Sequence, residues 1–216
     1  MGKLHNLFLE TIKSLGISES MHPLFYNAPI GIRFEIGGDE EIYLKRRKVN
    51  PVYIEEAFKR ANAIYQNLPE FDLLRIDIYP DERNYQQRPL NLKDFTNIGL
   101  PLPKEKKIEN IIIDDEEHQE VYLYWDLSSQ EIEIGKLLIE IIKADIGGFN
   151  ELASAVYFVN TKEKILYHLY DDRGLDVVAK TVKTLRSTYY EYNSWILDYD
   201  KDEIEKNFKE SDLSSN

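Results

Sequence analysis

Alternating hydrophobic and polar residues, the period of a half-buried β-strand, are clearest in residues 30–36. Four hydrophobic side chains at the even positions from Ile30 to Ile36 face one side, while Arg33 and Glu35 face the other. Glycine and acidic residues follow at 37–40, so the pattern predicts a β-hairpin between this strand and residues 41–45. Similar alternation predicts strands at residues 73–79 and 117–126.

A period near 3.6 predicts helices at residues 3–15, 51–68 and 182–196. Asn50 followed by Pro51 places a capping residue before a proline at the first helical position. Ser128 and Glu131 have the spacing of a capping box, which predicts a helix that begins there and ends at glycines 147 and 148. A last, acidic helix is expected from Asp200.

Three short strands at residues 154–160, 165–170 and 175–180, with turn residues between them, predict an antiparallel meander. The chain therefore reads as an α+β protein, with a mostly antiparallel sheet of about six strands, helices packed against it, and a C-terminal three-stranded meander plus helix. Residues 1–205 are expected to form a single domain, with any soft boundary in the proline-containing loop region 80–110. Residues 206–216 are expected to form a frayed acidic tail.

The net charge of the chain limits the kinds of partner that it is expected to bind. The 216 residues contain 39 acidic and 27 basic side chains, a net charge of −12, which argues against a general nucleic-acid binder. There is no cysteine, so disulfides and cysteine-ligated metals are excluded. No apolar run approaches the roughly 20 residues of a membrane span. The expected location is the cytoplasm, with no membrane or nucleic-acid partner, no cofactor and no assigned oligomeric state.

Charged residues and a histidine in two strand regions form a candidate polar site: Arg33, Glu35, His168, Asp171, Asp172 and Arg173. Two carboxylates beside an imidazole could bind a divalent metal or share a proton. The same residues also suit a tight turn in which an aspartate accepts backbone N–H groups and Gly174 adopts a positive φ. No metal-binding histidine pair supports the first interpretation, so no metal or catalytic residue is assigned.

Tyrosine is unusually frequent, with 15 residues. Most should lie in the core or on half-buried sheet faces. On an acidic protein, tyrosines also suit a protein-binding surface, because a rigid amphipathic ring supplies contact area at low entropic cost. Tyr189, Tyr192, Trp195 and Tyr199 are the candidate interface.

Three stretches together resemble a bacterial family described as domain of unknown function 3885. They are His22-Pro23-Leu24-Phe25-Tyr26-Asn27 with residues 31–37 close behind, Tyr167-His168-Leu169-Tyr170-Asp171-Asp172-Arg173-Gly174, and Tyr192-Asn193-Ser194-Trp195-Ile196-Leu197-Asp198-Tyr199. The resemblance spans residues 20–205 and implies a cytoplasmic protein of low-GC Gram-positive bacteria, without an activity or catalytic residues.

Two looser resemblances are short or concern order alone. Residues 37–41 resemble the GGDEF signature of diguanylate cyclases only in that string, and a turn is the preferred interpretation. The C-terminal order of strands, turn and aromatic helix is similar to the end of SMI1/KNR4-type proteins, many of which are immunity partners of bacterial toxins.

Two functions follow as hypotheses. The first is a non-catalytic protein-binding module, an immunity-type or regulatory partner of a basic protein, and it rests on the acidic charge and the tyrosines. The second is a small hydrolase or nucleotide-processing enzyme that uses the candidate polar site.

Overall fold

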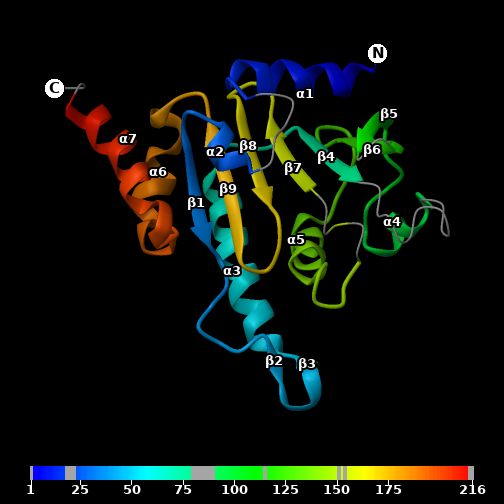
Figure 1. Cartoon of the computed structure of the whole chain (residues 1–216), viewed down its shortest axis with the longest axis horizontal. Coiled ribbons are helices and arrows are strands. Elements are labelled where there is room, and N and C mark those ends of the chain that lie inside the picture. Colours follow the sequence, from blue (N-terminus) through cyan, green and yellow to red (C-terminus); the bar gives the residue numbers. More distant parts are fainter. Residues whose placement is uncertain are drawn as a thin grey trace.

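One seven-stranded sheet runs through the computed structural model, which describes residues 2–17, 23–78, 91–113, 116–149, 152 and 155–213. The strand order is β1-β9-β8-β7-β4-β6-β5, and every neighbouring pair is antiparallel (Figure 1). The strands are β1 (Gly31–Glu35), β4 (Leu73–Ile78), β5 (Glu105–Ile113), β6 (Glu116–Asp126), β7 (Ala155–Asn160), β8 (Ile165–Leu169) and β9 (Gly174–Ala179).

Helices cover both faces of this sheet. On one face lie α3 (Pro51–Asn67), α5 (Ile134–Lys143) and α6 (Val182–Glu191), with α7 (Lys201–Leu213) packed on α6. On the other face lie α1 (Lys3–Ser14) and the short α2 (Leu24–Asn27). Because the side chains of a strand alternate between the two faces of the sheet, they pack into two separate hydrophobic cores, one on each face.

The predicted fold class is confirmed, with seven strands in the sheet rather than about six. The C-terminal meander is also confirmed, because β7 pairs with β8 and β8 with β9. The Asn50 side chain accepts a hydrogen bond from Val52 N at the start of α3, as a capping residue should. In the part of the chain that the structure describes, no helix combines the length and apolar character needed to cross a bilayer.

The predicted hairpin between residues 30–36 and 41–45 is wrong. β1 pairs with β9, and Ile36 N donates to Arg173 O just beyond that ladder. Residues 43–44 instead form β2 (Tyr43–Leu44), which pairs with β3 (Lys48–Val49) in a small hairpin that projects from the start of α3 (Figure 1). The turn residues predicted that β1 pairs with the nearest segment. It pairs instead with the distant β9, whose apolar side chains lie beside its own.

The region 80–110 holds more structure than predicted, although residues 79–90 lie outside the described part. It contains the short α4 (Asp94–Asn97) and the first half of β5. β4, which precedes this region, pairs with β6 and β7, which follow it, in the same sheet.

Helix boundaries were also predicted wrongly, among them the end of the helix over residues 182–196, since α6 ends at Glu191. The capping box at Ser128 and Glu131 does not form, because Gln130 binds Asp126 N and Leu102 O in a turn, and α5 begins only at Ile134. At the other end of the chain, α7 continues to Leu213.

The tail predicted from residue 206 is therefore partly ordered. Phe208 is buried and stacks on Tyr189 with 4.2 Å between ring centroids, which holds α7 against α6.

Candidate functional site

A row of polar and aromatic side chains crosses the sheet on the face that carries α1. Strand register places them as direct neighbours, in the order Arg33, Asp176, His168, Tyr157, Arg75, Tyr124. Polar groups in a buried row must bind one another to offset the loss of water. The row does so at two places, one on β1 and β9 and the other on β4.

The first place is an ion-pair cluster around Arg33. Its Nε lies 2.8 Å from Asp176 Oδ1 and its Nη2 lies 3.1 Å from Asp176 Oδ2, a bidentate pair. Arg33 Nη1 also lies 3.6 Å from Asp200 Oδ2. The guanidinium stands over the Tyr26 ring, 4.6 Å from its centroid. Both aspartates are buried, so the arginine is held between two carboxylates and an aromatic face.

Asp200 reaches this cluster because the chain after α6 runs along the outer edge of β1. Ile196 forms a β-bridge with Phe34, and Leu197 N donates to Arg33 O. Asp200 then ends a 3₁₀ turn and accepts a hydrogen bond from the Tyr26 hydroxyl at 2.8 Å. A later segment of the same chain thereby covers the outer edge of β1 at residues 33–34.

Burial sets the electrostatics of this cluster. It raises the pKa of Asp176, against the lowering effects of the Arg33 guanidinium and of the Phe25 backbone N–H. Burial alone would lower the pKa of Arg33, but its bonds to Asp176 raise that pKa above its ordinary value. The pair is thus one unit in which neither side chain can lose its partner cheaply.

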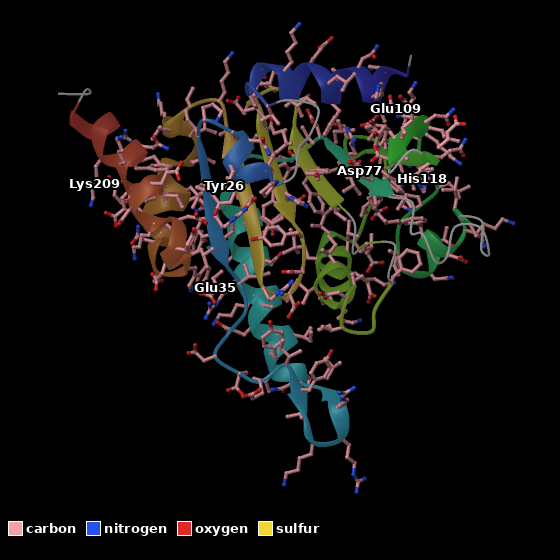
Figure 2. All side chains as sticks on the ribbon, in the orientation of Figure 1. Tyr26, Glu35, Asp77, Glu109, His118 and Lys209 are labelled. Atoms are coloured by element: carbon pink, nitrogen blue, oxygen red, sulfur yellow. The ribbon has the colours of Figure 1, made fainter. Side chains whose placement is uncertain are left out.

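The second place is a buried ion pair between Arg75 and Asp77 on β4. The Arg75 guanidinium lies 4.1 Å from the Phe8 ring centroid and 4.2 Å from that of Tyr122, so α1 closes over it. Four strand spacings separate β4 from β1, about 19 Å, so the two arginines cannot share a small ligand. In Figure 2, Tyr26 lies beside β1 and Asp77 lies on β4, and β9, β8 and β7 separate these two strands.

His168 lies between these two places and is buried. Its ring centroid is 4.5 Å from that of Tyr157 and 5.4 Å from that of Tyr170. Asp176 is its direct neighbour on β9. The imidazole is therefore packed among rings.

The remaining predicted polar residues lie at the β8–β9 turn. Asp171 Oδ1 accepts from Arg173 N at 2.8 Å and from Gly174 N at 3.1 Å, and its other oxygen binds the Arg173 side chain. Asp172 is buried and accepts from the Tyr53 hydroxyl of α3. The predicted carboxylate cap of the turn is confirmed for Asp171.

The predicted positive φ at Gly174 is wrong, since the positive-φ glycines of the described chain are elsewhere. A glycine is needed there for a different reason. A Cβ at this position would overlap the Tyr170 hydroxyl. Close approach of a side chain, rather than backbone strain, selects the glycine.

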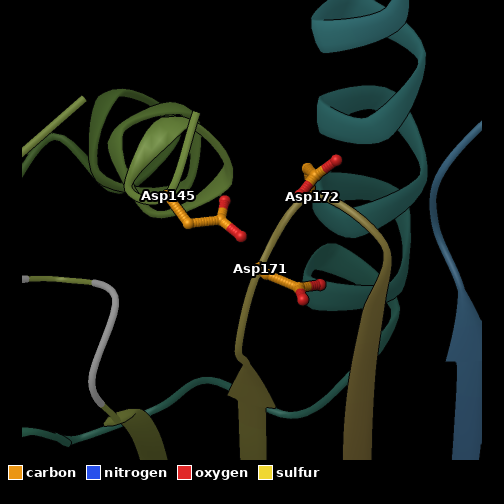
Figure 3. A group of neighbouring side chains, drawn as sticks. All are labelled: Asp145, Asp171 and Asp172. Carbon is orange, nitrogen blue, oxygen red and sulfur yellow. The ribbon is translucent and has the colours of Figure 1, made fainter. Parts of the chain in front are cut away.

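One group of carboxylates has the composition of a cation site. Asp145, in the turn after α5, faces Asp171 and Asp172, and one oxygen of each lies within 4.8 Å of the others (Figure 3). Burial, followed by the charges of Asp172 and Asp171, raises the pKa of Asp145. Three carboxylates could hold a hard cation. Two of them, however, already bind Arg173 and Tyr53.

A family model described as a domain of unknown function, DUF3885, matches residues 6–200. The chain belongs to the DUF3885 family. An uncharacterised protein of Bacillus subtilis (strain 168), YnaE, is 37% identical over 57 residues, which are 26% of this chain and 27% of that protein. The matched segment thus spans about a quarter of this relative. No solved structure matches the chain.

The three stretches that carry the DUF3885 resemblance converge on the Arg33 cluster. The first stretch supplies Tyr26 and Arg33. The second supplies His168, which lies next to Asp176 in the row, and the third ends at Tyr199, which precedes Asp200. Sequence reasoning missed Asp176 and Asp200. Both are single acidic residues far from Arg33 in the chain, and only the register of β1 with β9 brings Asp176 opposite it.

The candidate interface residues divide between core and surface. Tyr189 is buried, so it cannot contact a partner directly. Tyr192 stacks on Trp195, with 4.9 Å between ring centroids, and both are half-buried. Tyr199 is 86% exposed, and Tyr26, which was not among the predicted interface residues, is 50% exposed.

A second surface feature was also missed. The tip of the β2–β3 hairpin carries four consecutive basic residues at positions 45–48, all exposed. Arg46 and Arg47 have positive φ values of 67° and 56°, which reverse the chain there. The run is visible in the sequence, but the interpretation of charge considered only the net value of −12 and so overlooked it.

Proposed function

We propose that this protein is a non-catalytic cytoplasmic binding module that docks a basic protein, as an immunity-type or regulatory partner. The proposed docking surface, called here the tyrosine face, consists of Tyr26, Asp198, Tyr199, Asp202 and Glu203. The observation that carries the proposal is the exposure of the two tyrosine rings above buried Asp200. Exposed aromatic side chains are the residues that most often anchor protein interfaces.

The tyrosine face is held in place before any partner arrives. Asp200 accepts the Tyr26 hydroxyl, and Arg33 holds Asp200 from below. Tyr199 lies in the 3₁₀ turn that the Leu197 N–Arg33 O hydrogen bond ties to the sheet edge. Such a surface loses little conformational entropy on binding, which favours affinity.

Charge favours a basic partner. Asp198, Asp202 and Glu203 are exposed around Tyr199, and the whole chain carries a net charge of −12. A negative surface speeds the encounter with a positive one, and salt screens the effect. An acidic tyrosine surface is therefore suited to basic proteins such as nuclease toxins.

The alternative, a small hydrolase or nucleotide-processing enzyme, would use Arg33, Glu35, His168, Asp171, Asp172 and Arg173. Its supporting feature is the group of three carboxylates with Asp145. Against it, Arg33 and Arg173 bind Asp176 and Asp171, so a substrate would have to displace these partners. A thermal-shift screen with divalent metals and nucleotides separates the two functions. We expect no shift, and a metal-induced shift that Asp172→Asn abolishes would favour the enzyme.

Affinity capture from the native cells at low salt tests the binding proposal. Wild type should capture a basic protein, and Tyr199→Ala should lose it. Tyr43→Ala is the matched control, because Tyr43 is also exposed, at 47%, but lies on the projecting hairpin. The captured protein should dissociate as salt increases. Capture of no protein, or equal capture by Tyr199→Ala, would contradict the proposal.

A further inference from the structure

The outer edges of the two outermost strands, β1 and β5, differ in how they are covered. The outer edge of β1 is covered by Ile196 and Leu197. β5 is the last strand at the other side, and within the described residues no strand lies beyond it. It is nine residues long. Long open edges are rare in soluble proteins, because unpaired backbone groups recruit another strand.

Exposed isoleucines make this edge more unusual. Ile108 is 45% exposed and Ile112 is 77% exposed, both on the β5 face opposite the one under α1. Proteins that keep an edge strand unpaired place charges or proline there rather than isoleucine. β5 does carry charged residues, but its two exposed isoleucines are the feature of a strand that is covered in the functional state.

We propose that β5 pairs with β5 of a second copy of this chain, antiparallel and centred on Ile108, to form a continuous sheet across a two-fold axis. This inference does not depend on the proposed function. The tyrosine face lies beside β1, at the opposite edge, and would stay free in the dimer.

Charge complementarity selects the second copy and the register. With the axis at Ile108, Lys107 lies opposite Glu109 of the partner subunit, and the symmetry repeats this pair. On the sheet face away from α1, Ile108 lies opposite the partner subunit's Ile108, and Lys106 lies opposite Asn110 of the partner subunit. Cross-strand pairs of opposite charge and of β-branched residues stabilise a sheet.

Shifting the axis by one residue removes this match. An axis at Lys107 would place two lysines against each other, and one at Glu109 would do the same with two glutamates. Like charges directly opposite one another destabilise a strand pair. Lys107 Nζ lies 3.9 Å from Glu109 Oε1 of the same chain, but 38% and 42% of the two side chains are accessible, so both can also contact a partner.

The local charge also allows two acidic molecules to approach here. Residues 104–109 contain three lysines and two glutamates, although the chain as a whole is strongly negative. The net charge of −12 makes two copies repel each other on average, apart from basic stretches such as residues 45–48. Of the lysines that would protect an edge strand here, Lys107 has an acidic partner in this register.

Sedimentation velocity over a range of protein concentrations tests the proposal through charge reversal. Wild type should be a dimer, whereas Lys107→Glu and Glu109→Lys should each raise the dissociation constant by at least about tenfold, since two ion pairs become two repulsions. The double variant Lys107→Glu/Glu109→Lys should restore the dimer. Lys162→Glu makes the same charge change at an exposed residue in the β7–β8 turn and should remain dimeric.

Circular dichroism on every variant confirms that the changes act on assembly rather than on folding. A wild type that stays monomeric at all concentrations would overturn the proposal. So would a dimer that survives both single reversals, or a double variant that remains monomeric. None of these results depends on capture of a basic partner, so this test and that of the proposed function fail separately.

Discussion

The β1 and β5 sides of the sheet use the same chemistry in different surroundings. At β1, Arg33 pairs with two buried carboxylates under a covered edge. At β5, Lys107 Nζ lies 3.9 Å from Glu109 Oε1 on an open edge, and both side chains are partly exposed. Water weakens the second pair, whereas the first cannot lose a partner without leaving a buried charge. Charge therefore stabilises the fold at β1 and remains available for assembly at β5.

The largest expected effect is that of Arg33→Ala. It leaves Asp176 and Asp200 buried without their cation, and removing one partner of a buried pair costs about 3–5 kcal/mol. Lys107→Ala should change the free energy of unfolding of the monomer by less than about 0.5 kcal/mol, as for other exposed sites. Urea denaturation of both variants under monomeric conditions measures the difference. Similar small losses would remove the contrast between the two sides.

Gly174→Ala should have the next largest effect, a loss of about 1–3 kcal/mol, because the new methyl group overlaps the Tyr170 hydroxyl beside β1. In the Tyr170→Phe background the loss should be smaller, since the hydroxyl is the nearest atom. Asp172→Asn keeps an oxygen acceptor for Tyr53 and should cost little. Denaturation midpoints of the single and double variants test this, and equal losses in both backgrounds would rule out the overlap as the cause.

Tyr26→Phe should cost about 1 kcal/mol, because it removes the hydroxyl that donates to buried Asp200. Tyr43→Phe is the control, because it removes the hydroxyl of another exposed ring, on the projecting hairpin, and it should leave the free energy of unfolding unchanged. Thermal denaturation at fixed salt compares them. Equal stability of the two variants would show that Asp200 is not held by Tyr26.

The smallest effect belongs to His5, near β5. Burial, followed by the charge of Arg75, lowers the pKa of His5 below its ordinary value of 6.5, and its Nδ1 lies 2.8 Å from the Tyr124 hydroxyl. The unfolded chain therefore binds a proton at a higher pH than the folded one, so this contribution to stability falls as the pH drops below 6.5. Wild type should lose more stability in that range than His5→Gln. Parallel pH profiles would contradict the assignment.

Local patterns in the sequence predicted the elements well, but long-range pairing could not be predicted. The Asn50-Pro51 start of α3 and the three strands of the meander depend on neighbouring residues. The partner of β1 is 143 residues away at the Arg33–Asp176 pair, and no local signal specifies it. The predicted hairpin failed for that reason.

The candidate site was predicted in part for the same physical reason. Arg33 stood out because it interrupts an apolar strand, and Asp171 because it begins a turn. Asp200 could not be connected to Arg33, because the segment that carries it crosses the sheet edge through the Phe34–Ile196 bridge. The predicted helix over residues 182–196 concealed this segment, since its aromatic spacing continues past the true end at Glu191.

Hydrogen exchange of the backbone amides at low and high protein concentration compares the two edges directly. The account predicts slow exchange in residues 31–35 at both concentrations, because β9 and the segment at Ile196 hold that strand. Residues 105–111 should exchange faster in dilute solution and become protected at high concentration, and Lys107→Glu should abolish this gain. Equal exchange of residues 105–111 at both concentrations would contradict the view that one edge is closed within the molecule and the other by a second copy.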